Sequence, residues 1–170
     1  MSVETLLGLW KNTRAGFIKE LERIPGDQLS FRATPQTRSV LELTHHVIGS
    51  GKFFVGETCR PDTNILRRPF NEHTKAYGEG VDTVSDKAGL IEVLHSTMND
   101  AEKSLMSYGD QLNESMTGLD GKPISKLAFL MFGMSHEMYH RGQLTVFERL
   151  LDVEPALTEQ FRKLVARGAS

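Results

Sequence analysis

Two histidines four residues apart, His136 and His140, are the side chains whose type and spacing most directly suggest chemistry. They lie in an apolar stretch that runs from residue 127 to residue 151. On a helix, side chains four residues apart stand one above the other on the same face, so the two imidazoles can bind one metal ion. The spacing predicts a metal site; the alternative is a pair of hydrogen-bonded core histidines without a ligand.

The same segment matches the H-E-x-x-H pattern of zinc proteases, in which the glutamate, here Glu137, is the general base. The sequence does not continue as it does in the metzincin proteases, because position 143 is glutamine and no histidine follows His140. No strand-rich substrate cleft is predicted beside the helix, although three downstream carboxylates could supply a third ligand: Glu148, Glu154 and Glu159. Proteolysis is therefore a remote alternative.

A second histidine pair, His45 and His46, offers a third imidazole. Adjacent residues of a helix point about 100° apart, so only one of the two can normally reach a shared ion. Their angles from the apolar stripe leave open which one. Three neutral imidazoles suit zinc, nickel, copper or iron, and they leave coordination positions free for water or a substrate.

These histidines need helices to position them, and apolar residues recur at helical intervals in four stretches. We expect the helices at 3–24, 39–58, 85–108 and 125–151. Ser39 and Glu42 have the spacing of a capping box, and Ser85 and Ser125 are expected to cap the third and fourth helices. A shorter amphipathic piece, 156–166, should pack outside. Four principal helices predict an all-α four-helix bundle, a fold that builds metal sites from inward-facing side chains.

The connections are of two kinds. Residues 59–83 mix prolines and glycines with apolar anchors, which predicts a long ordered crossover between the second and third helices, placed over one end of the bundle. Residues 113–123 are rich in turn formers, including Asp120-Gly121, and predict a short hairpin.

The length, charge and cysteine content of the chain indicate its number of domains, its location and the partners that it lacks. A chain of 170 residues predicts one domain over residues 1–170, and its net charge of -2 argues against a nucleic-acid partner. The single cysteine, Cys59, cannot form an internal disulfide, and the N-terminus lacks a signal-peptide pattern. We therefore expect a cytoplasmic protein. No apolar run approaches the ~18 residues needed to cross a membrane, so no membrane partner is expected.

The two histidine segments, in their order along the chain, resemble the DinB-like family. The residues that carry the resemblance are the run 41–47 with its approach 31–35, and the late run 136–143, which reads His-Glu-Met-Tyr-His-Arg-Gly-Gln. The likeness covers about residues 3–151 and is only general in character over 59–123.

This resemblance implies a four-helix bundle of up-down-down-up topology that holds a divalent metal on three histidines. By motif position, the ligand on the second helix is the histidine followed directly by an apolar residue, which is His46. The implied metal ligands are thus His46, His136 and His140, with His45 beside the site or at the surface. Zinc or nickel is the expected metal, and iron, manganese or copper are alternatives.

The resemblance also implies two classes of function. Some family members are transferases or isomerases that use a low-molecular-weight thiol of the mycothiol or bacillithiol kind on small electrophiles. A divalent cation suits this chemistry because it favours the thiolate, which is the nucleophile. The alternative is a non-catalytic metal-binding protein with a role in stress response. The family further implies a homodimer.

Several other residues admit structural roles. The run 141–143 could form a polar patch that orients a ligand, although its glycine equally suits close helix packing. Tyr139 is expected among the aromatic side chains of the bundle, and Cys59 is expected to be inert. His73 and His95 have no histidine partner at ligand spacing, so we expect both to face solvent.

Overall fold

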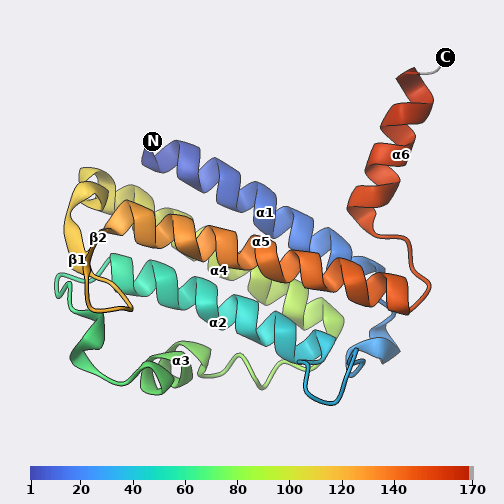
Figure 1. Ribbon diagram of the computed structural model, residues 1–170, viewed down its shortest axis with the longest axis horizontal. Helices are drawn as coiled ribbons and strands as arrows, with labels where there is room; N and C mark the ends of the chain where they lie inside the picture. Colours follow the sequence, from blue (N-terminus) through green and yellow to red (C-terminus); the bar gives the residue numbers. More distant parts are fainter. Residues whose placement is uncertain (169–170) are drawn as a thin grey trace.

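Four long helices form the body of the protein. The computed structural model describes residues 1–168, so the end of the expected domain, residues 169–170, lies outside the described residues. In chain order, the long helices are α1 (Val3–Arg23), α2 (Val40–Thr58), α4 (Lys87–Tyr108) and α5 (Lys126–Leu150). Figure 1 shows α1 and α5 running in one direction, and α2 and α4 running in the other. This up-down-down-up order confirms the predicted all-α four-helix bundle.

Local capping interactions set where the helices begin. The hydroxyl of Ser39 accepts a hydrogen bond from the backbone N–H of Glu42, and the carboxylate of Glu42 accepts one from the backbone N–H of Ser39, so the predicted capping box is formed. Ser125 caps α5, also as predicted. The prediction was wrong by one residue for α4, which is capped by the carboxylate of Asp86 rather than by Ser85.

The helices that carry the histidines are neighbours. α1 packs on α4 and α5, and α2 packs on α5 and α4, so that each long helix contacts two others. Two apolar clusters fill the space between them, one around Trp10 and Phe129 and the other around Phe17 and Leu144. Burying each such side chain stabilises the fold by roughly 1.5–3 kcal/mol. The core thereby fixes the contact between α2 and α5.

The crossover between α2 and α4 is folded, and it lies along α2 rather than over one end of the bundle as predicted. It contains a 3-10 turn, Ile65–Arg67, and a short helix, α3 (Phe70–Gly78), which packs against α2 (Figure 1). The buried carboxylate of Glu57 on α2 accepts hydrogen bonds from Nη2 of Arg67 at 2.7 Å and from the hydroxyl of Tyr77 at 2.8 Å. These charge-assisted bonds tie the crossover to the bundle.

His73 is part of this attachment, so the prediction that it faces solvent was wrong. Its side chain is 1% exposed, and its Nε2 donates to the carbonyl oxygen of Ile65 at 2.7 Å. Its Nδ1 lies 3.4 Å from Oε1 of Glu57. His95 is exposed, as predicted.

A hairpin and a last helix lie at the two ends of α5. Strands β1 (Ser115–Thr117) and β2 (Pro123–Ser125) form the predicted short antiparallel hairpin before it. After it, α6 (Ala156–Gly168) contacts α1 near its first turn and projects from the bundle (Figure 1). Among the described helices, none has both the length and the apolar character required to cross a membrane.

Candidate metal centre

Three imidazoles meet where α2 contacts α5. Nε2 of His136 lies 3.2 Å from Nε2 of His46 and 3.0 Å from Nε2 of His140. Candidate ligand atoms of all three residues lie within 4.8 Å of one another. The structure places His46 in this cluster, whereas Nε2 of the adjacent His45 lies 2.7 Å from the carbonyl oxygen of Val84.

The spacing of the three nitrogens suits a single ion. Two ligand nitrogens about 2.1 Å from a metal are about 3.0 Å apart at a right angle and about 3.4 Å apart in a tetrahedron. The separations of 3.0 and 3.2 Å fall within this range. Three protein ligands leave at least one position of a four-coordinate ion free. Metal binding by these residues stays a prediction, and their arrangement meets its geometric requirement.

Burial keeps the three imidazoles neutral. Burial is the main cause of a lowered pKa in all three, and the guanidinium of Arg38, which lies just before α2, acts in the same direction. With the neighbouring imidazoles, these effects lower the pKa of His46 to about 3 and that of His136 to about 4, and the pKa of His140 is lowered as well. A metal binds the neutral imidazole through its free lone pair, so near neutral pH these ligands need not first release protons.

Gln143 orients one of the candidate ligands. Nδ1 of His140 donates to Oε1 of Gln143 at 2.8 Å, which leaves the lone pair of the imidazole on Nε2. The other two residues of the run 141–143 do not take part. Arg141 pairs with Glu20 of α1 at 2.8 Å. Gly142 is exposed, with open space where a β-carbon would stand. It therefore neither contributes to a polar patch beside the site nor allows two helices to pack closely.

Glu137 faces α1, away from the imidazoles. Its carboxylate is buried, and it accepts hydrogen bonds from Nε1 of Trp10 at 2.7 Å and from Nη2 of Arg14 at 2.9 Å. A carboxylate paired in this way is not available as a general base beside the histidines, and the geometry therefore argues against proteolysis. The H-E-x-x-H match could not reveal this, because both partners lie more than 120 residues away in the sequence.

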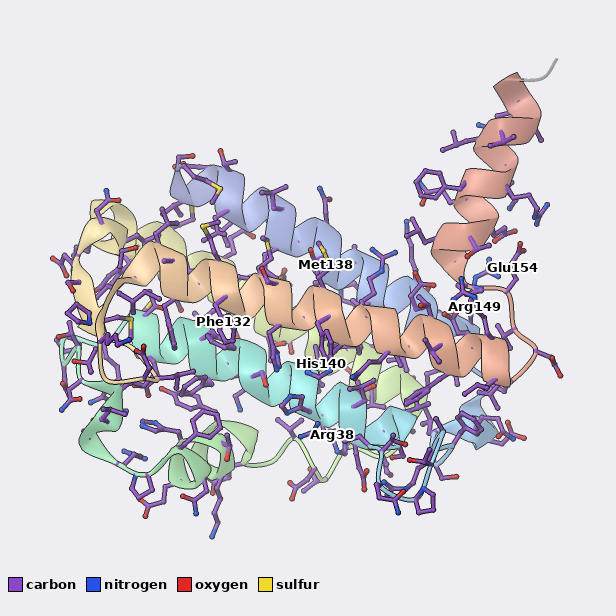
Figure 2. The ribbon with its side chains drawn as sticks, in the orientation of Figure 1. Arg38, Phe132, Met138, His140, Arg149 and Glu154 are labelled. Atoms are coloured by element: carbon purple, nitrogen blue, oxygen red, sulfur yellow. The ribbon has the colours of Figure 1, made fainter. Side chains whose placement is uncertain are left out.

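A cavity of about 990 Å³ adjoins the histidines between α2, α3 and α5. His46 and His136 form part of its lining, and Figure 2 shows Phe132 and His140 on the edge of α5 that faces α2. The aromatic residues of its wall are Phe53, Phe54, Phe70 and Phe132. Its volume is typical of a site for a small organic molecule.

Two other residues near these elements were assigned roles from the sequence. Tyr139 is 65% exposed, so the prediction that it packs inside the bundle was wrong. Cys59 is half-buried, and burial raises the pKa of its thiol. Because the thiolate is the reactive form, this agrees with an inert cysteine.

The family of the protein follows from a sequence comparison. A model of the DinB superfamily matches residues 9–144. The chain belongs to the DinB superfamily. The resemblance inferred from the two histidine segments is thereby confirmed for the greater part of the chain.

Solved structures have the same fold as this DinB superfamily member. A DinB-like protein from Bacillus cereus aligns with a TM-score of 0.70 and 17% identity, over 91% of this chain and 95% of the other. YfiT from Bacillus subtilis, described as a probable metal-dependent hydrolase with an unusual four-helix bundle topology, aligns with a TM-score of 0.68 and 17% identity, over 89% of each chain.

A mycothiol-dependent maleylpyruvate isomerase aligns with a TM-score of 0.59 and 11% identity, over 85% of this chain and 61% of the other. At these identities the likeness establishes the fold. A search among curated proteins found no significant match.

Proposed function

We propose that this DinB superfamily member binds one divalent metal ion on His46, His136 and His140 and acts on a small molecule held in the adjoining cavity. The observation that carries the proposal is the convergence of three neutral imidazoles, two of which, His46 and His136, line a cavity of about 990 Å³. A site that only stored or stabilised a metal would not need such a space beside it. Zinc or nickel is the proposed ion, since neutral imidazoles suit both.

The proposed reaction is the transfer of a low-molecular-weight thiol to a small electrophile, or a thiol-dependent isomerisation. A divalent cation at the histidines would supply the positive charge that favours the thiolate of the co-substrate. The similarity of fold to a mycothiol-dependent isomerase supports this class of chemistry.

The chain's own cysteine is a poor candidate for this thiol. Cys59 lies thirteen positions beyond His46, at the far end of α2, which corresponds to about 20 Å along a helix. Burial also raises the pKa of its thiol. The nucleophile must therefore come from a separate thiol compound, for which the cavity offers room.

A second candidate is hydrolysis. An open coordination position is also what a hydrolytic metal site needs to activate water, and YfiT, which shares the fold, is described as a probable metal-dependent hydrolase. Glu137 cannot serve as its base, because Trp10 and Arg14 hold its carboxylate on the other side of α5. Thiol consumption separates the two reactions, since hydrolysis uses none.

Metal analysis of three variants tests the proposed site. His46→Ala and His140→Ala should each retain less than about a tenth of the metal of the unaltered protein, because two imidazoles bind a divalent ion far more weakly than three. His45→Ala is the matched control: it removes the neighbouring imidazole, which contacts Val84 instead, and should leave the metal content unchanged. Undiminished metal in both cluster variants would overturn the assignment.

A screen of the metal-loaded protein then tests the reaction. Cysteine, mycothiol and bacillithiol are supplied with small electrophiles, and loss of free thiol is measured beside the His140→Ala variant. Consumption that depends on His140 supports the transferase. Metal binding without any turnover would instead support the non-catalytic alternative.

A further inference from the structure

The cavity has an aromatic wall whose outermost rings are left uncovered. Phe70 on α3 and Phe132 on α5 are 56% and 52% exposed, although both are large apolar side chains. They come from different elements and line the same cavity. Uncovered apolar groups gathered at one concave site indicate a surface that binds an apolar partner.

Ring contacts hold these two side chains in place. The ring of Phe70 lies 5.7 Å from that of Phe53, and the ring of Phe132 lies 5.6 Å from that of Phe54, both in edge-to-face geometry. Phe53 and Phe54 are buried on α2. The exposed rings are therefore supported from behind by the core, which is the preorganisation that a binding surface needs.

The aromatic wall leads to the histidines. The ring of Phe54 lies 6.0 Å from the imidazole of His136. Gly133 allows this arrangement, since a β-carbon there would lie 2.6 Å from the ring of Phe54. A molecule lying on Phe132 and Phe54 therefore has its inner end beside His136, where the proposed metal would be.

The charges around the cavity do not select a strongly charged ligand. Its lining contains two cationic side chains, Arg68 and Lys75, and three carboxylates, Glu72, Glu79 and Asp82. Apart from the proposed ion, which would attract the head of a ligand, the two signs nearly cancel, so the wall gives little preference for a charge on the ligand's body. Apolar contact with the rings is the recognition that the cavity offers.

We infer that this site takes substrates with a neutral, ring-sized apolar body, which lies against Phe70 and Phe132 and places a polar head at the three histidines. The inference rests on the proposed function, because it names the substrate class of the same metal site. It adds two specificity-determining residues that lie outside the metal cluster.

Two metal chelators that differ by a ring test the inference. Acetohydroxamate and benzohydroxamate share the head group that binds the metal, but benzohydroxamate also carries a phenyl ring. Calorimetric titration of the zinc-loaded protein should show benzohydroxamate binding at least about tenfold more tightly, as burial of a ring predicts.

Variants separate the protein's preference from the intrinsic difference between the chelators. Phe70→Ala and Phe132→Ala should each reduce the affinity ratio at least threefold and leave acetohydroxamate binding unchanged. Both side chains are more than half exposed, so the core stays intact. Leu9→Ala is the control, because this large apolar side chain is also about half exposed but lies on α1, away from the cavity. An unchanged ratio in both cavity variants would overturn the inference.

Failure of the metal proposal gives a different result. In that case neither hydroxamate binds and no zinc is retained. The aromatic wall is then tested on metal-free protein with the neutral dye N-phenyl-1-naphthylamine, whose fluorescence rises in apolar sites. Weaker dye binding in Phe70→Ala and Phe132→Ala, but not in Leu9→Ala, supports the aromatic site. Equal binding by all four proteins would overturn it.

Discussion

Single residues around the imidazoles decide whether the lone pairs of these side chains converge. His45 and His46 are adjacent and chemically identical, but α2 directs the first to the carbonyl of Val84 and the second to the cluster. Gln143 acts in a comparable way on α5, since it accepts from Nδ1 of His140 and so fixes where the other nitrogen presents its lone pair. Partners of this kind typically change metal affinity 10- to 100-fold.

Removing the hydrogen-bond acceptor of Gln143 should weaken metal binding although all three histidine ligands remain. Gln143→Leu keeps the approximate size of the side chain but cannot accept from His140, so we expect about a 10- to 100-fold lower zinc affinity. Gln143→Glu retains an acceptor and should bind zinc at least as tightly as the unaltered protein. Competition with a chromophoric chelator measures all three proteins. Equal affinity in the leucine variant would show that Gln143 does not orient the imidazole.

Another single residue, Glu148, controls stability rather than the candidate site. Its side chain is fully buried in α5, and neither carboxylate oxygen accepts a hydrogen bond from another described residue. Burial, the larger cause, and the neighbouring carboxylate of Glu20 together raise its pKa from 4.5 to about 8. The folded protein therefore holds Glu148 protonated at neutral pH.

This pKa predicts how stability varies with pH. Between about pH 4.5 and pH 8 the unfolded chain releases the proton of Glu148 and the folded chain keeps it, so this group lowers the free energy of unfolding as pH rises. Glu148→Gln removes the penalty and should raise stability at pH 8 by about 4 kcal/mol, or roughly 10 °C in melting temperature. At pH 4.5 the two proteins should melt together.

Glu22→Gln, at an exposed position of α1, is the control for this experiment and should not change the melting temperature at either pH. Melting is followed by circular dichroism. A glutamine variant that melts like the unaltered protein at pH 8 would show that Glu148 carries no such penalty.

At the scale of elements, locally encoded features could be predicted from the sequence. The capping box of Ser39 and Glu42, the cap at Ser125 and the apolar periodicity of the long helices involve residues within a few positions of one another, and the structure has them as expected. The positions of His136 and His140 on one face follow from the same local geometry. This is why the two late histidines could be paired from spacing alone.

Features that depend on distant partners could not be predicted in this way. α3 is a nine-residue helix, shorter than an isolated helix needs to be stable; its attachment relies on Glu57, which lies on another element. The burial of His73 has the same cause. The choice between His45 and His46 likewise required the family resemblance, because it depends on how α2 faces α5. Spacing within one helix carries no such information.

At the scale of the whole molecule, the surface of α6 bears on the predicted homodimer. The polar side of this helix is fixed to the bundle: Glu159 pairs with Arg23, and the backbone N–H of Ala156 donates to Glu20 at 2.6 Å. Its apolar side chains are left exposed by 39–72%: Leu157, Phe161, Leu164 and Val165. They recur at spacings of three and four and so form one face. A helix tied to the bundle at its first turn, with such a face outward, is suited to packing against a second copy of the chain.

The homodimer prediction can be tested by mass in solution. Light scattering during size exclusion should give twice the chain mass of 19.0 kDa. Val165→Glu places a charge on the exposed face of α6, where it would be buried in a dimer, and should shift the protein toward the monomer because an unpaired buried charge is costly. Leu66→Glu, an equally drastic change at an exposed apolar position of the crossover, should leave the dimer intact. Monomeric unaltered protein would contradict the dimer itself, and a dimer that persists in Val165→Glu would place its interface away from α6.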